Sequence, residues 1–181
     1  MKELSIIPHI GIGTLKLGMS PEEILETINQ ICIEFHSPKI NNLQISKDVN
    51  EDDGSYYLRY QNDFFFFMVQ YNNGHAIEIG VDRQISEHTI VKLYDLDVFK
   101  TPAEELVLSL KKISPCSYDG TDEQLGTNYE FHRIGVRLWR EHPFHEKLLS
   151  DPAYVEEMKN ILHEMFRYRY FDIAAVQLVK K

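Results

Sequence analysis

The chain has 181 residues, of which 43% are hydrophobic and 26% charged, and its formal net charge is −9. This size and composition suit one soluble globular domain or two small units with a shared core. The acidic balance argues against nucleic-acid binding, which needs clustered Lys and Arg, and no apolar run reaches the roughly 20 residues of a membrane span.

The negative charge is uneven along the chain. Residues 1–90 contain 6 Lys and Arg against 13 Asp and Glu, whereas residues 91–181 contain 13 against 15. If charge steers binding, we expect the acidic first half to meet a basic partner. The simpler explanation of the acidic residues is that they only keep the protein soluble. The start lacks the continuous apolar core of a signal peptide, and two distant cysteines do not make a disulfide framework, so we expect a cytoplasmic protein.

The first predicted helix follows the stretch "GIGTLKLGMS" at residues 11–20. That stretch comes close to a phosphate-binding loop, but Met19 stands where the loop needs a lysine, so it predicts no nucleotide site. Ser20 at the N-cap, Pro21 at N1 and Glu23 at N3 form a capping box. Apolar residues then recur with the helical period, which predicts a helix from about 21 to 34.

Strands follow in the rest of the first half. The acidic run at 49–55 is typical of a solvated turn, and the aromatic segments "YYLRY" and "FFFFMVQY" read as strands. "NNG" at 72–74 predicts a hairpin turn. In the return strand the alternation predicts a wet face with Glu78, Gly80 and Asp82.

The second half repeats the beginning of the first. Thr101, Pro102 and Glu104 again supply an N-cap hydroxyl, a proline at N1 and an acid at N3. The apolar positions of the helix after them match those of the first helix at a constant offset of 82: Leu106, Val107, Leu110 and Ile113 against Ile24, Leu25, Ile28 and Ile31. This predicts two copies of a strand, turn, helix and sheet unit, unless the shared helix start is coincidental.

The chain ends with a further predicted helix and strand. Asp151 and Pro152 start the helix, whose apolar face contains Val155, Met158, Ile161, Leu162 and Met165. The segment "FRYRYFDIAAVQLV" at 166–179 reads as one bent or broken strand. We therefore predict an α+β protein of two similar halves, 1–90 and 91–181, each with a capped helix on an antiparallel sheet, within one compact domain.

The segment "IGTLKLGMSPEEIL" resembles the opening of units in the BLIP-like and BamE-like folds, the β-lactamase inhibitor protein and a small outer-membrane assembly lipoprotein. The likeness is carried by Leu15, Leu17, Gly18, Met19, Ser20, Glu23, Ile24 and Leu25. The resemblance implies a tandem repeat, as in the inhibitor. The second copy lacks the Gly-Met pair, and no periplasmic or secreted role is implied. In its general character, as an acidic protein with aromatic-rich sheets, the chain also resembles the immunity proteins of bacterial polymorphic-toxin systems. No particular residues carry this second resemblance.

Catalytic and metal-binding patterns are weak. His142 and His145 have metal-ligand spacing, and with His163 they offer an alternative function as a small zinc enzyme. Cys116 and Ser117 lie in a turn without a nucleophile elbow or a base nearby in sequence. Trp139 is either an interface anchor or part of the core of the second half. We expect no cofactor, no metal and no catalytic residues.

The prediction for function is non-enzymatic binding of another protein, most simply an immunity-type inhibitor that blocks a basic bacterial toxin. Self-association into a homodimer is left open. The residues predicted to contact the partner are acidic or aromatic: Asp48, Glu51, Asp52, Asp53, Tyr56, Tyr57, Asp82 and Trp139.

Overall fold

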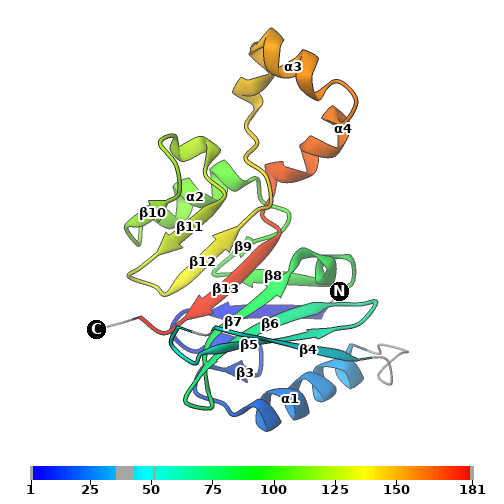
Figure 1. Cartoon of the computed structure of the whole chain (residues 1–181), viewed down its shortest axis with the longest axis vertical. Coiled ribbons are helices and arrows are strands. Elements are labelled where there is room, and N and C mark those ends of the chain that lie inside the picture. The colour runs from blue at the N-terminus through cyan, green and yellow to red at the C-terminus, as the bar shows by residue number, and fades with distance from the viewer. Residues whose placement is uncertain (1, 36–42, 51, 180–181) are drawn as a thin grey trace.

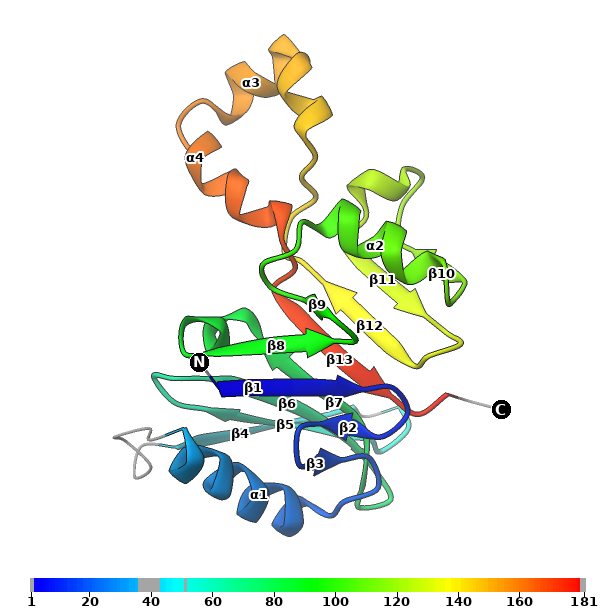
Figure 2. The same cartoon turned by 180° about the vertical axis from the view of Figure 1, so that it is seen from behind.

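The structure is a computed structural model and describes residues 2–35, 43–50 and 52–179. It has an α+β fold with two sheets, shown from opposite sides in Figures 1 and 2. The five-stranded sheet has the order β3-β2-β1-β8-β9. Its strands are β1 (Lys2–Ile7), β2 (Gly11–Ile12), β3 (Leu15–Lys16), β8 (Thr89–Leu93) and β9 (Leu96–Asp97).

The larger sheet has eight strands in the order β10-β11-β12-β13-β7-β6-β5-β4. They are β4 (Gln44–Val49), β5 (Tyr56–Gln61), β6 (Phe66–Asn72), β7 (His75–Asp82), β10 (Cys116–Tyr118), β11 (Asn128–Phe131), β12 (Val136–Trp139) and β13 (Ile173–Gln177). All its pairings are antiparallel, and the only parallel pair in the described chain joins β1 to β8. Four strands from each half meet at β7 and β13.

The helices lie outside the sheets. They are α1 (Pro21–Glu34), α2 (Ala103–Lys111), α3 (Pro152–Met158) and α4 (Leu162–Met165), with 3-10 turns η2 (Arg83–Glu87), η3 (Glu123–Leu125), η4 (Glu146–Ser150) and η5 (Phe166–Arg169). Helix α1 confirms the predicted range. The Ser20 hydroxyl accepts from the Glu23 amide at 3.3 Å, and the Glu23 carboxylate accepts from the Ser20 amide at 2.8 Å. This capping box satisfies two helix-terminal N–H groups and fixes where α1 begins.

One face of the large sheet makes the core. The small sheet, α1 and α2 lie on that side, and they are in front in Figure 2. The side chains of β6 alternate between half-buried and fully buried, so only one side of this strand is enclosed. The fully buried side includes Phe67, Val69 and Tyr71, and it joins Ile24 and Ile28 of α1 in a single hydrophobic core with residues from both halves. The opposite side of the sheet, toward the viewer in Figure 1, carries the half-buried residues.

The β6–β7 hairpin confirms the predicted turn. Asn73 and Gly74 have φ angles of 50° and 76°, the left-handed values that a two-residue hairpin turn requires. The expectation that Glu78, Gly80 and Asp82 form a solvent-exposed face of β7 is wrong at two positions. Glu78 is 5% exposed because Arg137 pairs with it, and Gly80 is buried against the side chains of Ala175 and Ile173.

The start of the second helix differs from the prediction. Pro102, and not Thr101, is the N-cap of α2, and no side chain caps this helix. The carboxylate of Asp97 accepts hydrogen bonds from the amides of Phe99 and Lys100, so the turn before α2 is organised further upstream. Ile113, expected on the apolar face, lies beyond the helix and is 39% exposed.

Residues 141–171 form an arm that leaves the sheet between β12 and β13 and projects from the body (Figures 1 and 2). The single helix predicted after Asp151 is interrupted at 159–161, and α3 buries none of its side chains. The predicted final strand is also shorter, because Phe166–Arg169 is a 3-10 turn. A small separate core of Phe144, Met165 and Tyr168 holds the arm near its base.

Candidate functional site

The first candidate site is a cavity of about 250 Å³ between the start of α2 and the base of the arm. Apolar and charged side chains alternate around it. The lining comprises Pro102, Ala103, Glu104, Val107, Leu108, Glu123, Gln124, Tyr129, Arg140, Phe144, His145, Glu146 and Arg169. All of these residues belong to the second half of the chain.

Arg140 lies beneath this cavity and is only 2% exposed. Its Nε donates to the carbonyl of Gly126 at 2.9 Å, and its Nη1 donates to those of Phe144 and Tyr168 at 2.8 and 3.0 Å. Its Nη2 donates to the carbonyl of Gln124 and to the Tyr129 hydroxyl. These bonds use all five N–H donors of the guanidinium. Arg140 therefore ties four chain segments together and has no donor left for a ligand.

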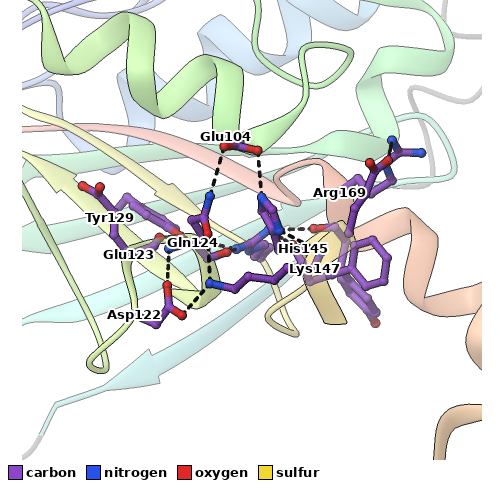
Figure 3. A network of polar contacts seen from close by, with 12 residues as sticks. Glu104, Asp122, Glu123, Gln124, Tyr129, His145, Lys147 and Arg169 are labelled. Carbon is purple, nitrogen blue, oxygen red and sulfur yellow. Dashed lines mark hydrogen bonds and ion pairs between the residues drawn. The ribbon is translucent and has the colours of Figure 1, made fainter. Parts of the chain in front are cut away.

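A polar network joins cavity-lining residues to their neighbours (Figure 3). The His145 Nδ1 accepts from the amide of Lys147 at 3.0 Å, so its Nε2 carries the proton and donates to Glu104 at 2.8 Å. Gln124 donates to the other oxygen of the same carboxylate. The hydrogen bond from His145 lowers the pKa of Glu104, which is therefore ionised at neutral pH. The Lys147 ammonium donates hydrogen bonds to the side chains of Asp122 and Gln124.

This geometry leaves little room for acid–base or metal chemistry at His145, because both ring nitrogens already have partners. The other two histidines of the zinc alternative lie in different surroundings. His142 packs edge-on against Tyr168, and the exposed His163 lies beside Glu164. Across residues 2–35, 43–50 and 52–179, no three His, Cys, Asp or Glu side chains are grouped so that they could hold a metal ion.

The structure also brings a base to Ser117 that the sequence did not reveal. The Ser117 hydroxyl lies 2.7 Å from His132 Nε2, although the two residues are 15 positions apart. His132 Nδ1 is 3.8 Å from the Glu130 carboxylate, which is beyond hydrogen-bond distance, and the His132 side chain is 56% exposed. The acid therefore does not orient the ring as a catalytic triad requires.

The second candidate site is the uncovered side of the eight-stranded sheet, which we call the open sheet face. Register partners in adjacent strands point to the same side. One such row runs across the sheet through Arg59, Met68, Gly80, Ala175, Arg137 and Glu130. A parallel row includes Asp48 and Tyr57, and further along the strands lie Trp139, Ile173 and Asp82.

Four of the eight predicted contact residues therefore share the open sheet face: Asp48, Tyr57, Asp82 and Trp139. Tyr56 does not, because it stacks on the buried ring of Tyr71 on the core side. Asp52 and Asp53 lie in the turn between β4 and β5, and Glu51 is outside the described residues. Trp139 is half-buried, which is neither of the two expected extremes.

An ion pair lies at the centre of the open sheet face. Arg137 donates to both carboxylate oxygens of Glu78, with Nε 3.2 Å from Oε2. Burial alone would lower the pKa of Arg137, but the charge and hydrogen bonding of Glu78 raise it. Burial and the nearby Glu78 charge also raise the pKa of Tyr57. The centre of this face thus carries a paired charge that needs no further partner.

The rim of the open sheet face near the arm is held by a second ionic cluster. Asp172 is 5% exposed, contacts Arg83 at 3.0 Å and Arg167 at 3.5 Å, and accepts from the Glu141 amide. Asp82 lies beside this cluster. Burial raises its pKa, the hydrogen bond from the Gln84 amide opposes this, and the charge of Asp172 raises it further. The cluster joins η2 and the start of β13 to both ends of the arm.

Comparison with known proteins adds no relatives: the chain matches no protein-family model, no curated protein and no solved structure. Over the described part of the chain, no helix combines the length and apolar character needed to cross a membrane.

Proposed function

We propose that the protein binds another protein without catalysis, and that the open sheet face is its binding surface. The observation that carries this proposal is that Asp48, Tyr57, Asp82 and Trp139 share one uncovered sheet face, although they come from four strands that span residues 48–139 of the sequence. Aromatic side chains that are only half-buried, with a neutralised ion pair between them, are typical of protein interfaces.

The proposal takes a more specific form as an immunity-type inhibitor in the bacterial cytoplasm. Acidic groups outnumber basic ones on the open sheet face, where Asp48, Glu78, Asp82 and Glu130 accompany Arg59 and Arg137. Such a surface favours a basic partner and speeds its association. A rigid sheet laid over the active site of a toxin domain would exclude its substrate without contributing any chemistry.

We also propose that the chain arose by tandem duplication, as the resemblance to the BLIP-like fold implies. The strand order supports this, since β4 to β7 and β10 to β13 run outward in opposite directions from the central β7–β13 pair. The matched helix positions Ile24 and Leu106, and likewise Ile28 and Leu110, are all buried. The parallel β1–β8 pair does not follow the same symmetry.

The test requires a long toxin-like protein encoded next to this chain. Its C-terminal domain is mixed with the purified full chain, and binding is measured by titration calorimetry. Truncating Trp139 to Ala should weaken binding by about 2 kcal/mol, or roughly 30-fold. The matched control is Tyr94→Ala, because Tyr94 is 51% exposed in the turn between β8 and β9, away from the open sheet face. No complex at micromolar concentration, or equal losses for both variants, would contradict the proposal.

A further inference from the structure

Among the residues that the structure describes, nothing pairs with the outer edge of strand β4 in the large sheet. All six of its residues are exposed, and it pairs on one side only, with β5. Ile45 and Val49 are 48% and 58% exposed, so two apolar side chains stand at this edge. A long exposed edge with apolar side chains is normally shielded or paired, because it presents free N–H and C=O groups to other chains.

The hydrogen-bond pattern shows which groups are free. The Asn50 amide donates to the carbonyl of Ser55 at 2.8 Å, so the backbone N–H of Asn50 points toward the β5 side. Hydrogen-bonded and non-bonded pairs alternate along an antiparallel ladder. The backbone groups of residues 46 and 48 therefore also face β5, and those of Ile45, Lys47 and Val49 point outward.

These three outward residues are symmetric about Lys47. We propose that β4 pairs antiparallel with β4 of a second copy of this chain, around a two-fold axis at Lys47. In this register Ile45 of each copy lies opposite Val49 of the other, and each outward pair exchanges two backbone hydrogen bonds. Every free backbone group of the edge is then satisfied. On the open sheet face, the Ser46 hydroxyl of one copy lies opposite the Asp48 carboxylate of the other.

Two features make a second copy a suitable occupant despite the net charge of −9. The two Lys47 residues would face each other, but the Lys47 ammonium lies over its own Tyr56 ring, 4.1 Å from the centroid, which holds it away from the axis. Around β4, Lys47 and Arg59 accompany Asp48, and Arg59 pairs with Asp48 within one copy. Two copies therefore meet here with little charge repulsion, and the open sheet faces of both lie on the same side.

The first experiment is sedimentation velocity of the purified full chain from low micromolar to submillimolar concentration. A concentration-dependent dimer is expected. Lys47→Pro should weaken the dimer by about tenfold or more, because proline removes the central outward N–H. It leaves the β4–β5 ladder intact, since the 47 amide does not face β5. Lys47→Ala, the matched control, keeps the outward N–H and should dimerise at least as well as the wild type.

The second experiment traps the register by oxidation in a Cys116→Ser background. Across a hydrogen-bonded pair the two Cα atoms at position 47 lie about 5.5 Å apart, within the range of a disulfide. Lys47→Cys should form a disulfide-linked dimer, whereas Asp48→Cys, which lies opposite Ser46 of the other copy, should not. A monomer at all concentrations, or equal cross-linking of both variants, would overturn the proposal and leave the toxin-binding proposal untouched.

Discussion

Replacing Arg140 with Met should destabilise the protein strongly. Methionine fills a similar length but donates no hydrogen bond, so the carbonyls of Gly126, Phe144 and Tyr168 lose their buried donor. An acceptor left unsatisfied in the interior costs about 1–3 kcal/mol. Water can reach the cavity above Arg140 and restore part of this, so we expect a net loss of about 3–5 kcal/mol.

The assay is equilibrium unfolding in urea, followed by the fluorescence of Trp139, the single tryptophan and the neighbour of Arg140. The control is Arg169→Met, because Arg169 forms an ion pair with Glu146 in which both side chains are substantially exposed. Such a pair contributes under about 1 kcal/mol. The reasoning is refuted if Arg140→Met and Arg169→Met lower the free energy of unfolding equally.

The same variant should loosen the arm before it unfolds the body. Phe144 and Tyr168 lie at the two ends of the arm, and Arg140 holds both through one nitrogen. Trypsin should therefore cleave Arg140→Met faster than the wild type at Lys159, an exposed residue between α3 and α4. Unchanged cleavage at Lys159 together with a large stability loss would place the role of Arg140 in the body alone.

Three further predictions concern stability in urea. Ser20→Ala removes one side of the α1 capping box and should cost about 1 kcal/mol, whereas Thr101→Ala, which removes no cap, should cost under about 0.5 kcal/mol. Arg137→Met leaves the buried Glu78 carboxylate without its ion-pair partner and should lower the free energy of unfolding by about 3–5 kcal/mol. The double variant Arg137→Met with Glu78→Met should recover much of that loss. Asp82→Asn should stabilise the protein at neutral pH, because burial raises the pKa of Asp82, and this gain should shrink as the pH falls and the wild-type carboxyl is protonated. A gain independent of pH would contradict that explanation.

Local sequence signals predicted the elements that local contacts determine. The α1 start depends on Ser20 and Glu23, three residues apart, and the hairpin depends on the backbone freedom of Asn73 and Gly74. The same reasoning placed the α2 cap at Thr101 wrongly, because Asp97 organises the preceding turn instead. The continuous helix predicted after Asp151 fails because, of its apolar residues, only Met165 packs into a core.

Long-range contacts determine the candidate site, and the sequence could not show them. Glu78 looks like a solvent-facing residue until the strand order places Arg137 near it, 59 residues away in the chain. The burial of Arg140 depends on acceptors from three separate segments, and no local pattern marks it. By contrast, the grouping of Tyr57, Asp82 and Trp139 follows from strand alternation once the strand order is known.

The central position of β13 has a consequence for how the chain folds. β13 joins β12 to β7, and its pairing partners in β7 lie more than 90 residues earlier in the sequence. The two groups of four strands therefore cannot join into one sheet until almost the whole chain is available. Contacts of such long sequence separation form slowly because the intervening loop must first be closed. During synthesis, the edge of β7 that pairs with β13 stays unpaired until β13 has been made. In that period, chaperone binding or aggregation at this edge would compete with folding.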